Sequence, residues 1–357
     1  MKKIHCFLFI ILFAISGIEI KSQTTYIPDD NFLQVLIQMG YGEGVEGNYL
    51  PTSNISGVVH LYLPASNVSD LTGIEDFVAL MDLKCGFNQL SSLDLSANTA
   101  LTSLECYNNQ LTSLDISNCT ALTTLKCNSN QLIDLDLSGC PSLVTLHCSD
   151  NQVSNLDVSA NTALAFFYCS NNQLSNIDLS SNTELTHFRC ELNQFLSLDM
   201  SNNVILNHLW CSNNQLLSLD LRNGNNANIS ELNSENNSDL KCIYVDDKTA
   251  GFLSNWEKDE TAIFVNNENE CPTLSLIDFE KQNIVIYPNP TNGLFYIKFL
   301  QENIHKMTIF DIRGRIIFEL NCVHEIETVD LSLFSNGLYV VMLQSDKGSS
   351  FSKIIKE

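Results

Sequence analysis

The chain has 357 residues, of which 41 are acidic and 18 are basic, so its net charge is −23. Most of the imbalance lies in residues 23–273, which hold 30 acidic and 7 basic residues. A surface this acidic repels nucleic acid and anionic lipid, and the composition therefore argues against both as partners.

The first 22 residues have the pattern of a secretory signal peptide. Lys2 and Lys3 precede an apolar run from Cys6 to Ile18, and the small Ser22 precedes the expected cleavage point. The run is too short for a comfortable transmembrane helix, and no later segment approaches one. The chain is therefore expected to be exported through the inner membrane, and the mature chain is expected to carry no transmembrane segment.

Residues 23–57 are expected to form an N-terminal helical cap over the repeats that follow. Asp29 or Asp30 can cap a helix that Gly40 ends. The apolar residues of this helix recur at helical spacing and form one stripe, namely Phe32, Val35, Leu36 and Met39.

A cysteine recurs every 21 residues through the middle of the chain, at Cys85, Cys106, Cys127, Cys148, Cys169, Cys190 and Cys211. Each copy follows the pattern L-x-x-L/F-x-C-x-x-N-Q-L-x-x-L-D-L-S-x-N-T, and a degenerate copy with Ile229, Leu232, Ser234 and Asn237 comes after Leu221. A fixed period indicates a solenoid, because a single repeat cannot bury its apolar face alone.

This pattern resembles the leucine-rich repeat over residues 58–240, with cysteine in the third apolar position. The resemblance implies a rod or horseshoe with a parallel β-sheet and short second strands or turns on its convex side. An asparagine column stands where each strand turns inward and is expected to satisfy backbone groups of neighbouring turns, through Asn88, Asn109, Asn130, Asn151, Asn172, Asn193 and Asn214.

The seven in-register cysteines are expected to be a structural column of buried thiols. Equivalent residues on adjacent parallel strands lie about 4.8 Å apart with parallel side chains, whereas a disulfide needs converging Cβ atoms about 3.5–4.5 Å apart. A metal–thiolate ladder is the alternative, although zinc requires clustered tetrahedral ligands; no metal or cofactor is expected. Cys119 and Cys140, at the Asn98 position of successive repeats, could pair at a turn, and Cys322 has no evident partner.

Two further segments follow the repeats. Residues 241–273 resemble the C-terminal cap of secreted bacterial repeat proteins of this type, and in an oxidising compartment this favours a Cys242–Cys271 disulfide. In residues 274–357, apolar and polar residues alternate over short segments, which predicts short strands and a small β-sandwich.

The C-terminal stretch also resembles the sorting domain of the type IX secretion system of Bacteroidota. The residues that carry this resemblance are Tyr287-Pro288-Asn289-Pro290 with Asn292-Gly293, Asp311 with Gly314, Asp330-Leu331, Gly337-Leu338-Tyr339, Lys353 and Lys356. It implies recognition by the type IX machinery, passage across the outer membrane, and a secreted or cell-surface location.

The outward residues of the repeat strands predict a ligand-binding concave face. An aromatic and basic group stands out there on an acidic body, made of Lys126, His147, Phe166, Tyr168, His187, Arg189, His208 and Trp210. Aromatic residues with arginine are typical of binding hot spots, and cross-strand stacking that only stabilises the sheet is the alternative.

A second outward column consists of aspartates, at Asp94, Asp115, Asp136, Asp157, Asp178, Asp199 and Asp220. Local hydrogen bonds to backbone N–H groups and serine hydroxyls are expected to offset their mutual repulsion, and bound Ca²⁺ is the alternative.

The sequence contains no catalytic motif, so an enzyme is not expected. The favoured function is an exported or surface-displayed protein that holds a protein or peptide on its concave face. The alternative is a surface structural or glycan-adhesive protein.

Overall fold

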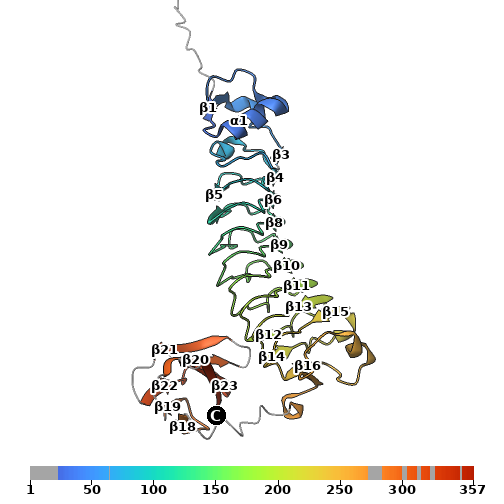
Figure 1. The fold of residues 1–357 in the computed structure, drawn as a ribbon, viewed down its shortest axis with the longest axis vertical. Helices are drawn as coiled ribbons and strands as arrows, with labels where there is room; N and C mark the ends of the chain where they lie inside the picture. The colour runs from blue at the N-terminus through green and yellow to red at the C-terminus, as the bar shows by residue number, and fades with distance from the viewer. Residues whose placement is uncertain are drawn as a thin grey trace, which may run out of the picture.

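The computed structural model describes residues 23–63, 65–271, 284–299, 304–311, 315–321, 326–345 and 348–357. The expected signal peptide falls outside these ranges, as do Gly314 and Cys322. Within the described part, the repeats stack into an elongated solenoid (Figure 1). None of the helices in these ranges has the length and hydrophobicity needed to cross a membrane.

The N-terminal segment combines a small sheet with one helix. β1 (Thr24–Tyr26) pairs antiparallel with β2 (Tyr49–Pro51), and α1 spans Asp30–Leu36. Asp29 caps α1, because its Oδ1 accepts a hydrogen bond from the Phe32 N–H at 2.9 Å. Its Oδ2 accepts from the Ser69 N–H at 2.8 Å, which ties this cap to the start of the solenoid.

The helix is shorter than predicted, and placing Met39 in its buried stripe is wrong. After α1 the chain makes a π-helical turn over Ile37–Tyr41, with Gly40 at φ 93°. This wider turn breaks the helical spacing that would carry Met39 inward, and Met39 is 40% exposed. Leu33 is buried instead, beside Phe32 and Leu36.

The repeats contribute one strand each to a nine-stranded parallel sheet. Its strands are β3 (His60–Tyr62), β4 (Asp82–Lys84), β6 (Ser103–Glu105), β8 (Thr124–Lys126), β9 (Thr145–His147), β10 (Phe166–Tyr168), β11 (His187–Arg189), β13 (His208–Trp210) and β15 (Glu231–Asn233). Equivalent residues pair in register, as Phe166 does with His187. In every strand the central residue is buried and its two neighbours face outward.

The opposite side of the solenoid carries shorter sheets, in agreement with the predicted second strands. β5 (Ser92–Asp94) pairs with β7 (Ser113–Asp115), and a four-stranded sheet contains β12 (Ser197–Asp199), β14 (Ser218–Asp220), β16 (Cys242–Tyr244) and β17 (Ile263–Val265). Single 3₁₀ turns lie at Thr52–Asn54, Ile74–Asp76, Asn226–Asn228, Gly251–Asn255 and Glu268–Glu270.

The seven cysteines of the column are buried in the core as free thiols. Cys119 and Cys140 are also free, so the pairing considered for them does not occur. Each thiol points to a backbone carbonyl of the preceding turn instead, Cys119 to Leu95 and Cys140 to Ile116, both at 3.5 Å. The two sulfurs are thus directed the same way along the solenoid and do not converge.

The asparagine column joins successive turns. Asn109 Nδ2 donates to the carbonyl oxygens of Cys85 and Cys106, both at 3.0 Å, and Asn109 Oδ1 accepts from the Leu90 N–H. A second ladder lies at the Asn98 position, where Asn182 Nδ2 donates to the carbonyls of Val158 and Asn161. These amides satisfy the backbone groups that each interior bend would otherwise leave unpaired.

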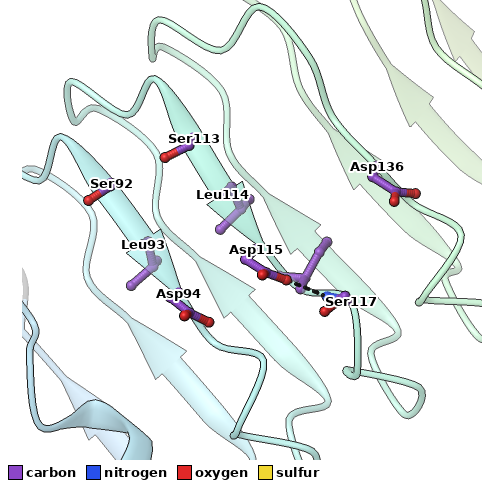
Figure 2. Close-up of a pocket in the computed structure, with 9 residues that line it drawn as sticks. Ser92, Leu93, Asp94, Ser113, Leu114, Asp115, Ser117 and Asp136 are labelled. Atoms are coloured by element: carbon purple, nitrogen blue, oxygen red, sulfur yellow. Dashed lines mark hydrogen bonds between the residues drawn. The ribbon is translucent and has the colours of Figure 1, made fainter.

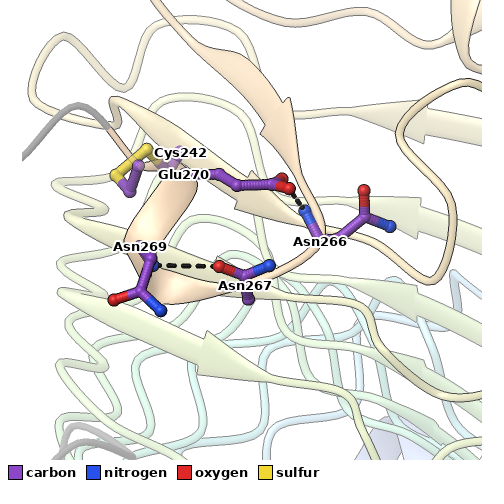
Figure 3. The surroundings of a disulfide bond; sticks show 6 residues. Cys242, Asn266, Asn267, Asn269 and Glu270 are labelled. Atoms are coloured by element: carbon purple, nitrogen blue, oxygen red, sulfur yellow. Dashed lines mark hydrogen bonds between the residues drawn. A yellow bond between two sulfur atoms is a disulfide. The ribbon is translucent and has the colours of Figure 1, made fainter.

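The end of the solenoid is closed by a covalent bond and a buried tryptophan. Cys242 and Cys271 form a disulfide with a Cα–Cα distance of 5.8 Å, next to the turn at Glu268–Glu270 (Figure 3). Trp256 is buried, and its indole N–H donates to the Ile229 carbonyl at 3.1 Å. The degenerate copy therefore packs like the regular repeats, with Leu232 and Ser234 inside.

The C-terminal residues fold as two antiparallel sheets around one core. One sheet contains β18 (Ile284–Tyr287), β19 (Leu294–Phe299) and β22 (Ile326–Asp330), and the other contains β20 (Ile304–Asp311), β21 (Ile316–Asn321), β23 (Gly337–Ser345) and β24 (Gly348–Lys356). Both sheets contribute to the core, which includes Phe295, Val329, Ile309 and Val341. Asn289 bonds the backbone of Lys353 and Ile355, so the loop after β18 is fixed to β24.

Candidate binding surface

The outward side chains of the nine-stranded sheet form two parallel columns, which we call the sheet face. The first column begins at His60 and ends at Glu231, and the second begins at Tyr62 and ends at Asn233. Because strands pair in register about 4.8 Å apart, residues that are 21 apart in the repeats become direct neighbours. The sheet face is therefore a continuous surface assembled from every repeat.

The eight predicted binding residues lie together on β8, β9, β10, β11 and β13, and we call them the patch. Their side chains are half-buried or exposed, and Phe166 is 37% exposed. The two Thr residues of the first column, Thr124 and Thr145, complete this part of the face. No aspartate, glutamate, asparagine or glutamine points outward from these five strands.

The rings of the patch contact one another across the strands. Phe166 lies 4.9 Å from His187 between ring centroids, and His187 stacks on His208 at 4.3 Å with an interplanar angle of 14°. Tyr168 meets His147 edge-on at 5.5 Å. The stacking considered as an alternative to binding is thus present, and it holds the ring faces in fixed positions.

Arg189 lies between two rings of the second column. Its guanidinium carbon is 3.8 Å from the centroid of the Trp210 ring and 6.0 Å from that of Tyr168. The closer contact is a cation–π interaction, which contributes about 0.5–2 kcal/mol. The arginine is held by stacking and remains exposed.

Two histidines of the patch favour the neutral form. Burial lowers the pKa of His147, assisted by Lys126 and Arg189 against the opposing charge of Asp150. Burial also lowers the pKa of His187, together with His208 and Arg189. His208 Nδ1, next to His187 in the stack, is buried without a hydrogen-bond partner among the described residues.

Carboxylates border the patch at both ends. Lys126 Nζ lies 3.0 Å from Glu105 Oε1, and His208 Nε2 lies 3.8 Å from Glu231 Oε1. Beyond Glu105, Tyr62 donates to Asp82 at 2.8 Å, and Lys84 lies over the Tyr62 ring. The sequence prediction missed His60 and Tyr62, because their strand precedes the cysteine pattern; Leu61 and Leu63 in the same frame are the signal that could have found them.

The aspartate column on the other side forms the local bonds expected of it. Asp94 Oδ1 accepts from the Ser96 N–H at 2.9 Å, and the same bond recurs along the column. Hydrogen bonds from the Ser96 hydroxyl and N–H lower the pKa of Asp94. A hollow of about 390 Å³ lies between Asp94, Asp115 and Asp136 (Figure 2). In the described ranges, no cluster of three or more His, Cys, Asp or Glu residues could hold a metal ion.

Comparison with known proteins identifies two segments. Residues 120–161 match the model of leucine-rich repeats in two copies, and residues 285–357 match the secretion system C-terminal sorting domain. No curated protein matches the chain at a significant level.

Solved structures that match the chain come from several bacteria. The functional domain of InlJ from Listeria monocytogenes, which includes a cysteine ladder, is 21% identical with a TM-score of 0.31, covering 94% of this chain and 98% of that one. Internalin C2 from the same organism is 21% identical with a TM-score of 0.46, covering 63% and 98%. YopM from Yersinia enterocolitica is 24% identical with a TM-score of 0.46, covering 59% of this chain and 43% of its own length. The predicted resemblances are confirmed at the level of these segments: the chain carries leucine-rich repeats and, at its C-terminal end, a type IX secretion C-terminal sorting domain.

Proposed function

We propose that this protein is an exported, non-enzymatic binding protein that holds a protein or peptide on its sheet face. Leucine-rich repeats suggest a protein-binding role, and the sorting domain points to export and to a surface or secreted location. The finer assignment, which places the ligand on the patch, is supported by one observation. On a solenoid with 30 acidic and 7 basic residues, five neighbouring strands present rings and cations and no outward carboxylate.

Fixed rings favour binding rather than stability alone. A surface whose side chains are already ordered loses little conformational entropy when a partner docks. Trp, Tyr and Arg are also the residues most enriched in binding hot spots, and all three meet where Arg189 lies between Tyr168 and Trp210. The stacking therefore gives the patch the pre-organisation that a binding site requires.

The test compares two aromatic pairs. The double variant Tyr168→Ala with Trp210→Ala should lose specific, saturable capture of a partner protein in a pull-down with the full mature chain. Its free energy of unfolding should fall by only about 1–3 kcal/mol, the sum expected for ring contacts and one cation–π contact. The control is Tyr26→Ala with Tyr49→Ala, since these two exposed rings contact each other at 5.2 Å in the N-terminal cap, away from the patch.

Three results would contradict the proposal. If the double variant still captured the partner, the patch would not be the binding site. Retention of the protein only on polysaccharide, with no saturable protein partner, would support the glycan-adhesive alternative. A loss of stability much larger than the control's would favour a purely structural role for the stacked rings.

A further inference from the structure

Arg189 differs from the other cations of the sheet face in having no carboxylate beside it. Lys126 is paired with Glu105 at 3.0 Å, and Lys84 faces Glu105 in the strand register. The register neighbours of Arg189 are Tyr168 and Trp210. Within the described ranges, the Arg189 guanidinium makes no ion pair or hydrogen bond, so its charge is not neutralised by this chain.

Two carboxylates near the patch are engaged elsewhere, namely Glu191, two residues after Arg189, and Asp150, whose charge acts on His147. Glu191 accepts a hydrogen bond from the Ser170 hydroxyl, and Asp150 accepts one from the Asn171 side chain at 2.8 Å. The mature solenoid is acidic overall, and an unpaired arginine on it is an exception that calls for a physical reason.

The stack leaves the hydrogen-bonding edge of Arg189 available. The guanidinium presents its face to Trp210 at 3.8 Å, and the N–H groups lie in the plane of the guanidinium and not on its face. A planar fork held in this way matches the two oxygens of a carboxylate, which it can bind through two parallel hydrogen bonds. We infer that the patch takes a carboxylate of its partner onto Arg189, and that the partner is an acidic peptide segment. This inference rests on the proposed function and specifies its ligand.

The surroundings of Arg189 favour an anion at this place. Two cations and no outward acid lie between β8 and β13, while the aspartate column on the other side would repel a negative partner. The charges of the solenoid therefore direct an acidic segment to the patch and away from other surfaces. Screening limits this effect to about 8 Å at physiological salt, so only the segment near Arg189 needs to be acidic.

A peptide fits the patch better than a sugar. Sugar hydroxyls both donate and accept hydrogen bonds and need planar polar partners that accept, yet the five strands present no outward carboxylate or amide. One face of Trp210, which a sugar ring would otherwise cover, is occupied by Arg189. Phe166 is 37% exposed at the edge of the ring stack and can take an apolar side chain next to the carboxylate.

The test measures binding of a fluorescein-labelled peptide that alternates glutamate with tyrosine, by fluorescence anisotropy with the full mature protein. Arg189→Gln should weaken binding roughly tenfold to a hundredfold, the effect of losing a charge-assisted hydrogen bond. Arg189→Lys should restore only part of the affinity, because lysine lacks the fork. The matched control is Arg222→Gln, since Arg222 also lies over a ring, that of Tyr244 at 4.8 Å, but is paired with Asp220; this variant should bind as the unchanged protein does.

Three results would overturn the inference. Equal binding of a glutamine–tyrosine peptide would show that Arg189 does not recognise a carboxylate, although the patch would remain a binding surface. Tighter, Arg189-dependent binding of polygalacturonate would replace the peptide with an anionic polysaccharide. Absence of binding by the glutamate–tyrosine peptide would reject an acidic ligand, whereas the proposed function is decided separately by capture with the Tyr168 and Trp210 variant.

Discussion

Asn172 Nδ2 donates to the carbonyl oxygen of Cys148, 24 residues earlier in the chain, across 3.0 Å. The same amide donates to the Cys169 carbonyl at 3.1 Å, and its oxygen accepts from the Val153 N–H at 3.0 Å. One side chain thus satisfies backbone groups of two successive turns. The same bond recurs along the column and joins each turn to the one before it.

Asn172→Ala should lower the free energy of unfolding by about 2–4 kcal/mol, because each buried backbone group left unpaired costs about 1–3 kcal/mol. Urea unfolding followed by circular dichroism measures the loss. The control is Gln173→Ala, which changes the exposed neighbouring side chain and should have an effect within about 0.5 kcal/mol. A loss for Asn172→Ala within about 0.5 kcal/mol, the range expected of the control, would contradict the role of the asparagine column.

The nine free cysteines of the described residues should resist alkylation in the folded protein. Burial raises the pKa of both the Cys85 and Cys127 thiols to about 12, so neither forms the reactive thiolate at neutral pH. Mass spectrometry after iodoacetamide treatment should find these residues unmodified, and all of them modified after unfolding in guanidinium. Rapid labelling of Cys148 in the native protein would contradict the buried column.

Removing the Cys242–Cys271 disulfide should destabilise the C-terminal end of the solenoid. The bond closes a loop with a sequence separation of 29, for which the chain-entropy model gives about 3–4 kcal/mol. Cys242→Ala with Cys271→Ala should therefore show earlier unfolding in denaturant and faster proteolysis near Trp256. The control is Cys211→Ala, which removes a buried thiol without breaking a covalent link and should cost less.

Acidification should destabilise the patch. The pKa values of His147 and His187 in the folded protein lie below the ordinary value of 6.5. Between the folded-state values and 6.5 the unfolded chain binds more protons than the folded protein. The free energy of unfolding therefore decreases as the pH falls from about 6.5 toward the folded-state values. The melting temperature should decrease from pH 7 toward pH 5.

The double variant His147→Gln with His187→Gln should flatten this pH dependence. Carboxylates titrate mostly nearer pH 4 and contribute little between pH 7 and pH 5.5. A decrease of the same size in the double variant would assign the pH effect to other groups.

The solenoid, and the side on which each repeat residue lies, could be predicted from the sequence alone. A strict 21-residue period allows one way to bury the apolar positions, which is to stack them, and stacking places Cys106 inside and Glu105 outside. The residues of the patch could be predicted in the same way, because in-register strands place residues that are 21 apart in the sequence next to each other. The type of the C-terminal domain followed from its turn residues and alternation.

The contacts between outward side chains could not be predicted from the sequence. Whether Arg189 stacks on Trp210 or pairs with Glu191 depends on rotamers across adjacent strands, which no sequence period specifies. The thiol directions of Cys119 and Cys140 and the early end of α1 at Leu36 depend in the same way on local packing. The repeated positions determine the backbone and the buried core of this protein, because every turn must bury the same apolar residues. The outward residues differ from turn to turn, so their contacts depend on which side chains the stacking brings together.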